Sequence, residues 1–193
     1  MTESAALPLF ARALIEESAK KSAMVWVRGP QGPARPLWHV WQDGAVCLVG
    51  AAGGESESGG PGAAGVREQP LTGLGLVDGG AATVSVRSKD KGGRLVVWPA
   101  RVAEPQPHST SWTAAVEELR GKRLNAPDTE TLPERWAREC RVLRLEPAGD
   151  LVEQPGAVPD TPSHAVPLPT PATTREPAPA ALPALLFRRR KHS

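Results

Sequence analysis

The chain of 193 residues carries 23 lysines and arginines against 21 aspartates and glutamates, which gives a formal net charge of +2 at pH 7. This length fits one domain of ordinary size with a tail. Five basic and three acidic residues follow Asp150, so the part up to Asp150 is neutral overall. A neutral body argues against a nucleic-acid-binding domain, whose affinity comes from clustered lysines and arginines that neutralise phosphates.

The cysteine and histidine content argues against a disulfide framework and against a metal site. The two cysteines, Cys47 and Cys140, are too few for a disulfide framework or a cysteine metal site, and we expect buried reduced thiols. The four histidines show no metal-ligand spacing, so no metal is predicted. The N-terminus lacks the pattern of a secretory signal, and no apolar run approaches the roughly 20 residues of a membrane span. A cytoplasmic protein is therefore expected.

Two elements are predicted at the start of the chain. Apolar residues recur at helical spacing after Pro8 and predict a short helix over residues 9–20. Residues 22–27 predict a strand, and the loop rich in glycine and proline that follows could return the chain antiparallel.

The clearest β pattern lies at residues 37–49. Two runs rich in β-branched and aromatic residues flank Asp43 and Gly44, which can take the positive φ of a tight hairpin turn. The alternation places Leu37, His39 and Trp41 on one face and Trp38 and Val40 on the other. Because both faces carry large groups, we expect one inside a barrel and the other against a partner subunit or a cofactor.

Residues 50–80 are dominated by glycine, alanine, serine and glutamate. Such a composition buries little apolar surface, so residues 51–65 are predicted to form a disordered loop. The leucines of residues 71–76 could attach the later part of this segment to the barrel.

The alternating patterns of residues 82–88 and 94–98 predict two strands that are joined as a second hairpin. Pro99 cannot donate to a ladder, which predicts a bulge or a sheet edge there.

Two helices and a closing strand are predicted next. Residues 109–111 supply possible N-caps for a helix in which Gly121 is placed to end the last turn in the left-handed conformation. A second short helix carries Trp136 and Cys140 one turn apart, and the last strand covers residues 141–146. The basic residues Lys122 and Arg123 could reach a ligand, although the dipole of the preceding helix also explains their position.

The segment 151–193 holds nine of the 21 prolines and ends in the basic cluster 188–191. Prolines at this density prevent a helix or a central strand, so a disordered tail is predicted. The basic end could contact an anionic membrane surface or nucleic acid, but a solvated tail is the simpler interpretation because a single short cluster attracts only weakly.

The order of elements resembles the FMN-binding split barrel of the pyridoxamine-phosphate-oxidase-like superfamily, as found in many small actinobacterial proteins. The similarity covers residues 9–147 and rests on the strand order, on residues 24–27 and 36–44, and on the strand 94–102 before a tryptophan-bearing helix. It implies a mainly β (α+β) fold with peripheral helices, a six-stranded antiparallel split β-barrel. The domain would cover 1–150, followed by the proline-rich tail 151–193.

The resemblance also implies a cofactor. In that superfamily a flavin lies at a homodimer interface, with its phosphate held by basic and hydroxyl side chains on strands and adjoining turns. The corresponding positions here are Arg87, Ser88 and Lys89 at the end of the fourth strand, with Arg35 and His39 on the second. Three strand tryptophans, Trp38, Trp41 and Trp98, are first of all core residues and could also line a flavin ring pocket.

The resemblance thus implies a protein that binds FMN or a deazaflavin and, if it is an enzyme, acts as a flavin-dependent oxidoreductase on a small molecule. The catalytic residues are not predicted. Many members follow the third strand with a Ser/Thr-x-Lys phosphate segment, whereas residues 50–65 here contain no basic residue. This favours the alternative hypothesis, a non-catalytic barrel that serves as a ligand-binding or interaction module. A third hypothesis, nucleic-acid binding through residues 188–191, is less favoured.

Overall fold

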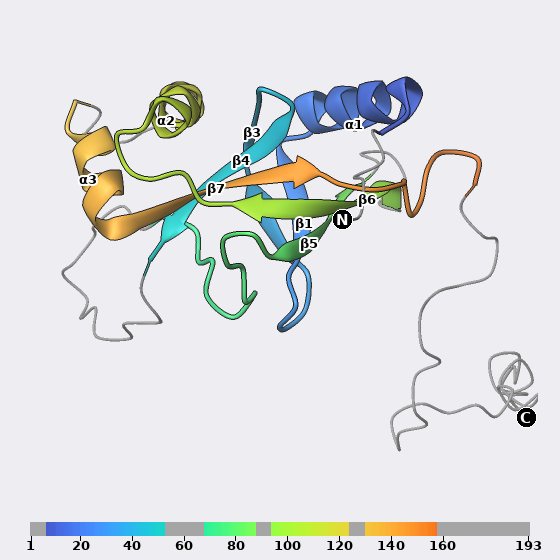
Figure 1. Cartoon of the computed structure of the whole chain (residues 1–193), viewed down its shortest axis with the longest axis horizontal. Coiled ribbons are helices and arrows are strands. Elements are labelled where there is room, and N and C mark those ends of the chain that lie inside the picture. The colour runs from blue at the N-terminus through green and yellow to red at the C-terminus, as the bar shows by residue number, and fades with distance from the viewer. Residues whose placement is uncertain (1–6, 53–67, 88–93, 124–129, 158–193) are drawn as a thin grey trace, which may run out of the picture. The chain divides into compact units, whose positions relative to one another are not determined.

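A computed structural model of the chain describes residues 7–52, 68–87, 94–123 and 130–157 (Figure 1). These residues form a mainly β structure with peripheral helices. The elements in chain order are α1 (Leu9–Lys21), β1 (Met24–Arg28), β2 (Arg35–Trp38), β3 (Val40–Gln42), β4 (Ala45–Ala51), β5 (Ala81–Arg87), β6 (Arg94–Ala103), α2 (Thr110–Lys122), α3 (Leu132–Glu139) and β7 (Cys140–Pro147).

The strands form one antiparallel sheet that curls into a nearly closed barrel. Its strand order is β2-β1-β5-β6-β7-β4-β3. The two ends of this order, β2 and β3, are consecutive in the chain and are separated only by His39. One predicted strand is therefore divided in two at His39, with its first half paired to β1 and its second half to β4. This division explains why the described residues contain seven strands where six were expected.

The barrel interior is filled by the inward positions of the strands. Each strand contributes to one apolar cluster, and from β3 the half-buried Trp41 packs against it. Trp98 is the largest fully buried side chain of this cluster. Helix α1 adds Ile15 and Ala19 to the same cluster, and loop residues between β4 and β5 add Leu71, Leu74 and Leu76. The three leucines thus attach this loop to the barrel, as the sequence predicts.

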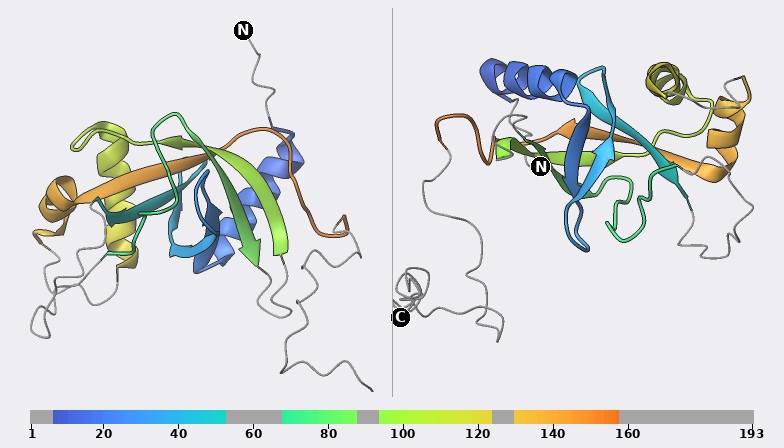
Figure 2. Two further views of the ribbon diagram at one scale, coloured as in Figure 1. Left: turned by 90° about the horizontal axis from the view of Figure 1, so that it is seen from below. Right: turned by 180° about the vertical axis from the view of Figure 1, so that it is seen from behind.

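A second apolar cluster covers the outside of one half of the barrel. It joins Val40, Cys47 and Val49 of the β3–β4 hairpin to the buried faces of α2 and α3, which include Trp112 and Trp136. The two helices lie together near one end of the barrel, whereas α1 lies toward the other end (Figure 2). The outward side chains of β3 and β4 are therefore covered by this chain's own helices, and Trp38 of β2 packs at the edge of the same cluster.

The hairpin turn has the geometry that its residues favour. Asp43 has φ of 49° and Gly44 has φ of 73°. Two successive positive φ values belong to a type I′ turn, whose twist matches that of the flanking strands. The face assignment for residues 37–41 is also confirmed, because Leu37 and Trp41 pack on the interior cluster and Trp38 and Val40 on the other.

Two local expectations are corrected. Gly121 lies within α2, which continues to Lys122, and the residue after the helix is Arg123 in an extended conformation. Pro99 lies neither at a sheet edge nor at a bulge, since β6 runs between β5 and β7 and Pro99 pairs in register with Thr83. The carbonyl of Pro99 accepts from Ala148 on the other side of the strand, so its nitrogen points there as well. On that side β6 pairs with residues 152 and 153 before Pro99 and with β7 after it. No ladder hydrogen bond therefore requires an N–H group at Pro99.

The described chain continues past β7. Residues 151–157 return along β6, where the backbone N–H of Val97 donates to the carbonyl of Glu153 at 3.0 Å. Arg94 forms an ion pair with Glu153 at 2.8 Å. Ala51, the first residue of the predicted disordered loop, ends β4, whereas residues 53–65 of that loop and residues 158–193 of the tail lie outside the described residues. Within the described ranges, no helix is long and apolar enough to cross a membrane.

Candidate functional site

The outer surface of β2, β1 and β5 carries two half-buried tryptophans, one of which, Trp38, packs at its edge against the cluster formed by α2 and α3. Met24 pairs with Trp38 and Trp26 pairs with Pro36, and directly opposite residues point to the same face of a sheet. The inward neighbours Val25 and Leu37 fill the barrel, so these four side chains point outward. We call this surface, with Arg87 of β5, the tryptophan face: Met24, Trp26, Pro36, Trp38 and Arg87. Its apolar centre is open, since Met24 is 44% exposed.

Arg87 lies on the tryptophan face. Its guanidinium carbon is 3.9 Å from the centroid of the Trp26 ring, well within the range of a cation–π contact. The side chain is exposed and forms no ion pair with any residue that the structure describes, so its N–H groups can still bind an anion. Ser88 and Lys89, which follow it in the predicted phosphate segment, lie outside the described residues.

A second arginine lies beside the other tryptophan of this face. The Arg123 guanidinium carbon is 5.7 Å from the centroid of the Trp38 ring. Arg123 follows the end of α2, and its side chain is 20% exposed. One of its terminal nitrogens is 3.5 Å from Oε1 of Glu68, whose side chain is only 1% exposed. The same carboxylate oxygen accepts from Arg135 at 3.3 Å and from the indole of Trp136 at 3.0 Å.

Gln69 holds Trp38 at the place where the strand divides. The Gln69 side-chain oxygen accepts from the Trp38 backbone N–H at 2.8 Å. Its side-chain nitrogen donates to the carbonyls of Trp38 and Val49, both at 3.0 Å. A buried backbone group without a partner is costly, and here one amide side chain replaces the ladder bonds that the break removes. Consecutive residues, Glu68 and Gln69, thus hold Arg123 and Trp38 respectively.

His39 lies at the break itself but faces away from this surface. Its side chain is buried, and Nε2 is 3.0 Å from the carbonyl of Ala19 at the end of α1. Because a carbonyl only accepts, Nε2 carries the hydrogen and donates it, and Nδ1 is buried without a hydrogen-bond partner among the described residues. Burial lowers the pKa of His39 to about 4, and the bond to Ala19 opposes this shift only in part. A neutral, buried imidazole offers no positive charge to a phosphate at pH 7.

Arg35 and Arg87 are not brought together. Arg35 pairs with Val27, and Val27 pairs on its other side with Val84. Arg87 is three residues farther along β5, which corresponds to roughly 10 Å along the strands. The Arg35 guanidinium instead lies against Gly73, in the loop that closes one end of the barrel. Of the three predicted residues that the structure describes, Arg87 lies on the tryptophan face and Arg35 and His39 do not.

The two thiols are poor nucleophiles. Both cysteines are free, and burial raises the pKa of Cys47 and that of Cys140 to about 11. Nearby Arg144 lowers the pKa of Cys47 only partly. A thiol with such a pKa is protonated at neutral pH, which argues against thiolate chemistry at either position.

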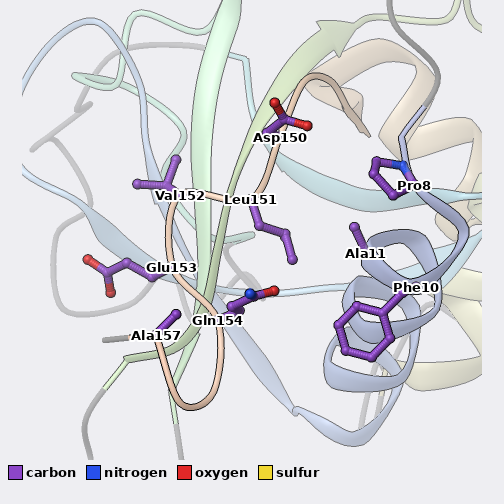
Figure 3. Close-up of a pocket in the computed structure, with 9 residues that line it drawn as sticks. All are labelled: Pro8, Phe10, Ala11, Asp150, Leu151, Val152, Glu153, Gln154 and Ala157. Atoms are coloured by element: carbon purple, nitrogen blue, oxygen red, sulfur yellow. The ribbon is translucent and has the colours of Figure 1, made fainter. Parts of the chain in front are cut away.

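A shallow pocket lies apart from the tryptophan face, between the start of α1 and the segment after β7 (Figure 3). It has a volume of about 290 Å³. Phe10 and Leu151 give it an apolar wall, and its charged lining residues are the acids Asp150 and Glu153. None of the lining side chains is a lysine or arginine, so this pocket lacks the charge that a phosphate requires.

Sequence reasoning did not find Glu68 or Gln69. Both belong to a glycine-rich segment without periodicity, and their partners are 20 to 68 residues distant in the chain. A weak signal exists, since an acid and an amide stand together directly before the leucines that attach the loop. Arg123 was noted as a residue that could reach a ligand, but its aromatic partner was not.

No protein-family model matches this sequence, and no curated protein does. Among solved structures, the chain is similar to HutZ, the heme storage protein from Vibrio cholerae, with 10% identity and a TM-score of 0.47 over 73% of this chain and 92% of that one. It is also similar to an F420 reductase, with 12% identity and a TM-score of 0.36 over 69% of this chain and 93% of the other. The barrel assignment itself follows from the strand order and register given above.

Proposed function

We propose that this protein binds a flavin, FMN or a deazaflavin, on the tryptophan face, and that it acts as a flavin-dependent oxidoreductase on a small molecule. The single observation that carries this proposal is Arg87, an exposed guanidinium stacked over Trp26 on an outer sheet face next to the exposed Met24. A flavin nucleotide combines a planar ring with a phosphate, and aromatic surface beside a guanidinium complements both.

The residues of the tryptophan face fit a flavin nucleotide in two respects. Arg87 would bind the phosphate, and Ser88 and Lys89, the next residues in the chain, would add donors to it. Trp26 and Trp38 would provide aromatic surface for the ring. When bound, a flavin supplies the redox chemistry, while the protein orients it and excludes water. Arg35 and His39 would have to contact another part of the ligand, given their distance from Arg87 and their burial respectively.

A homodimer belongs to the same proposal. Met24 on the tryptophan face is exposed, and a second copy placed there would both bury Met24 and enclose the cofactor. The proposed location is the cytoplasm, which agrees with two free thiols in one chain.

The alternative is a non-catalytic ligand-binding or interaction module with the same barrel. Two observations favour it: residues 50–65 contain no basic residue, and the tryptophan face would suit a protein partner as well as a ring. On this alternative the face buries a partner's apolar side chains and no flavin binds.

A spectroscopic experiment separates the two functions. The purified full chain is examined for flavin absorbance, incubated with FMN or a deazaflavin, and passed through a gel-filtration column. The proposal predicts that one of these cofactors elutes with a dimeric protein. A folded protein that retains neither cofactor would support the interaction module and overturn the flavin proposal.

A further inference from the structure

A second exposed arginine, Arg28, adjoins the tryptophan face. Burial alternates along β1, so that Val25 and Val27 fill the barrel while Trp26 and Arg28 point outward. Like Arg87, Arg28 forms no ion pair with any residue that the structure describes. Two exposed arginines without a charged partner therefore share the outer surface that contains Trp26.

The strand register brings these two arginines toward the same place. Trp26 pairs with Ser85 and Arg28 pairs with Thr83, so Arg28 is one outward position, roughly 7 Å, farther along β1 than Trp26. Arg87 lies two residues from Ser85 in the opposite direction, but its side chain turns back, because its guanidinium carbon is 3.9 Å from the Trp26 ring centroid. An arginine side chain is long enough to cover the remaining separation. Both guanidinium groups can therefore contact one ligand beside Trp26.

The described strands around Trp26 offer no acidic partner to these arginines. The outward positions of β1, β2 and β5 carry aromatic, apolar and hydroxyl side chains besides Arg28 and Arg87. Glu153, which lies beyond β6, is paired with Arg94 at 2.8 Å. Positive charges that share a surface repel each other, and an anion bound between them offsets this repulsion. Two guanidinium groups in this arrangement favour a ligand with two negative groups over a ligand with one.

We propose that Arg28 and Arg87 together bind a diphosphate group of a ligand whose planar ring contacts Trp26. Each guanidinium donates charge-assisted hydrogen bonds to phosphate oxygens, and the half-buried hydroxyls of Thr83 and Ser85 lie between the two arginines as further donors. The ligand is thus a nucleoside diphosphate or a dinucleotide. Only the identity of its ring rests on the proposed function, on which the flavin carries a second anionic group beside the phosphate of FMN.

The test uses calorimetric titrations of the full chain at low salt with two pairs of probes, AMP and ADP, and FMN and FAD. The members of each pair share a ring, and only ADP and FAD contain a diphosphate. In at least one pair we expect the diphosphate to bind about tenfold or more tightly than the monophosphate, since a second arginine contributes charge-assisted hydrogen bonds. The absence of this preference from both pairs, including the case in which no probe binds, would overturn the proposal.

A variant assigns the preference to Arg28. Arg28→Gln should weaken the diphosphate about tenfold and leave the monophosphate within about threefold. Arg120→Gln, an exposed arginine on α2, is the matched control and should leave all affinities within twofold. If Arg28→Gln does not fold, Arg28→Lys keeps the charge but loses the planar fork, and a several-fold loss is expected with an unchanged melting temperature. A diphosphate preference that persists unchanged in the folded Arg28 variant arises elsewhere, for example from the adenosine of FAD, and contradicts the proposal.

The two pairs of probes separate this inference from the flavin proposal. A protein that prefers ADP to AMP through Arg28 but retains no flavin would keep the diphosphate site and refute the proposed function. A protein that binds FMN and FAD equally, and does not distinguish ADP from AMP, would keep the flavin function and refute the diphosphate site alone.

Discussion

His39 is a single residue on which the closure of the barrel depends. It occupies the break between β2 and β3, and its donated hydrogen bond connects that break to the end of α1. Alternation in the sequence predicts that His39 is buried on the interior side, but it does not reveal the break, because alternation carries no information about which strand a residue pairs with. The compensating group, Gln69, is 31 residues away from Trp38 and has no local signature.

The lowered pKa of His39 predicts a pH-dependent stability. In the unfolded chain the imidazole binds a proton below about pH 6.5, whereas the folded state resists protonation until about pH 4. The unfolded state thus holds more protons between these values, so stability contributed by neutral His39 is complete above pH 6.5 and is lost as the pH falls toward 4. The loss from this group amounts to up to about 3 kcal/mol.

Urea unfolding of the wild type and of His39→Gln at pH 7 and pH 5 checks this prediction. The variant loses or weakens the bond to Ala19 and is expected to be less stable than the wild type by about 1 kcal/mol at pH 7. At pH 5 this difference should shrink or change sign, because glutamine does not titrate. Parallel pH dependence in the two proteins would show that His39 is not the titrating group.

At the scale of elements, two glycines illustrate what the sequence reveals and what it hides. Gly121 was expected to end α2 but lies in its last turn, and an added Cβ would meet no atom within 4 Å. Gly50 in β4 is crossed closely by the attached loop, so an added Cβ would overlap with Leu71 and with the Gln69 carbonyl. Strand pattern alone cannot predict this crossing, because it is a contact between distant segments.

Alanine substitutions at these glycines should act in opposite directions. Gly121→Ala is expected to stabilise the protein by about 0.5–1 kcal/mol, since alanine favours the helix over glycine. Gly50→Ala is expected to destabilise it by about 1–3 kcal/mol through the steric overlap. Thermal unfolding of both variants measures the two effects, and a stabilising Gly50→Ala would contradict the loop packing described here.

Glu68 connects the loop to α2 and α3. Its buried carboxylate binds Arg123, Arg135 and Trp136, so Glu68→Gln should remove the charge of Glu68 from its contacts with both guanidinium groups. We expect a loss of about 1–2 kcal/mol in the free energy of unfolding. The control is Glu139→Gln, an exposed member of a surface ion pair, for which less than about 0.5 kcal/mol is expected. Equal effects of the two substitutions would contradict a buried connecting role for Glu68.

At the scale of the whole molecule, the strands and helices of the barrel are predictable from the sequence because each is encoded by a local pattern of residues. Alternating strands, the Asp43–Gly44 turn and the helical spacing of the flanking segments each depend on neighbouring residues. The candidate site is less accessible to such reasoning. Arg87 was predicted, but its stacking on Trp26, and the meeting of Arg123 with Glu68 and Trp38, depend on the order of strands in the sheet and on the docking of α2.

The central claim is that Arg87 on the tryptophan face binds the phosphate of a flavin. Titration of the full chain with FMN at low salt, followed by the quenching of flavin fluorescence, tests it most directly. Arg87→Gln should weaken binding about tenfold or more, because one charge-assisted contact to phosphate is lost. Arg101→Gln, an exposed arginine on β6, should bind as the wild type does. FMN binding that is equal in all three proteins, or absent from the folded wild type, would contradict the claim.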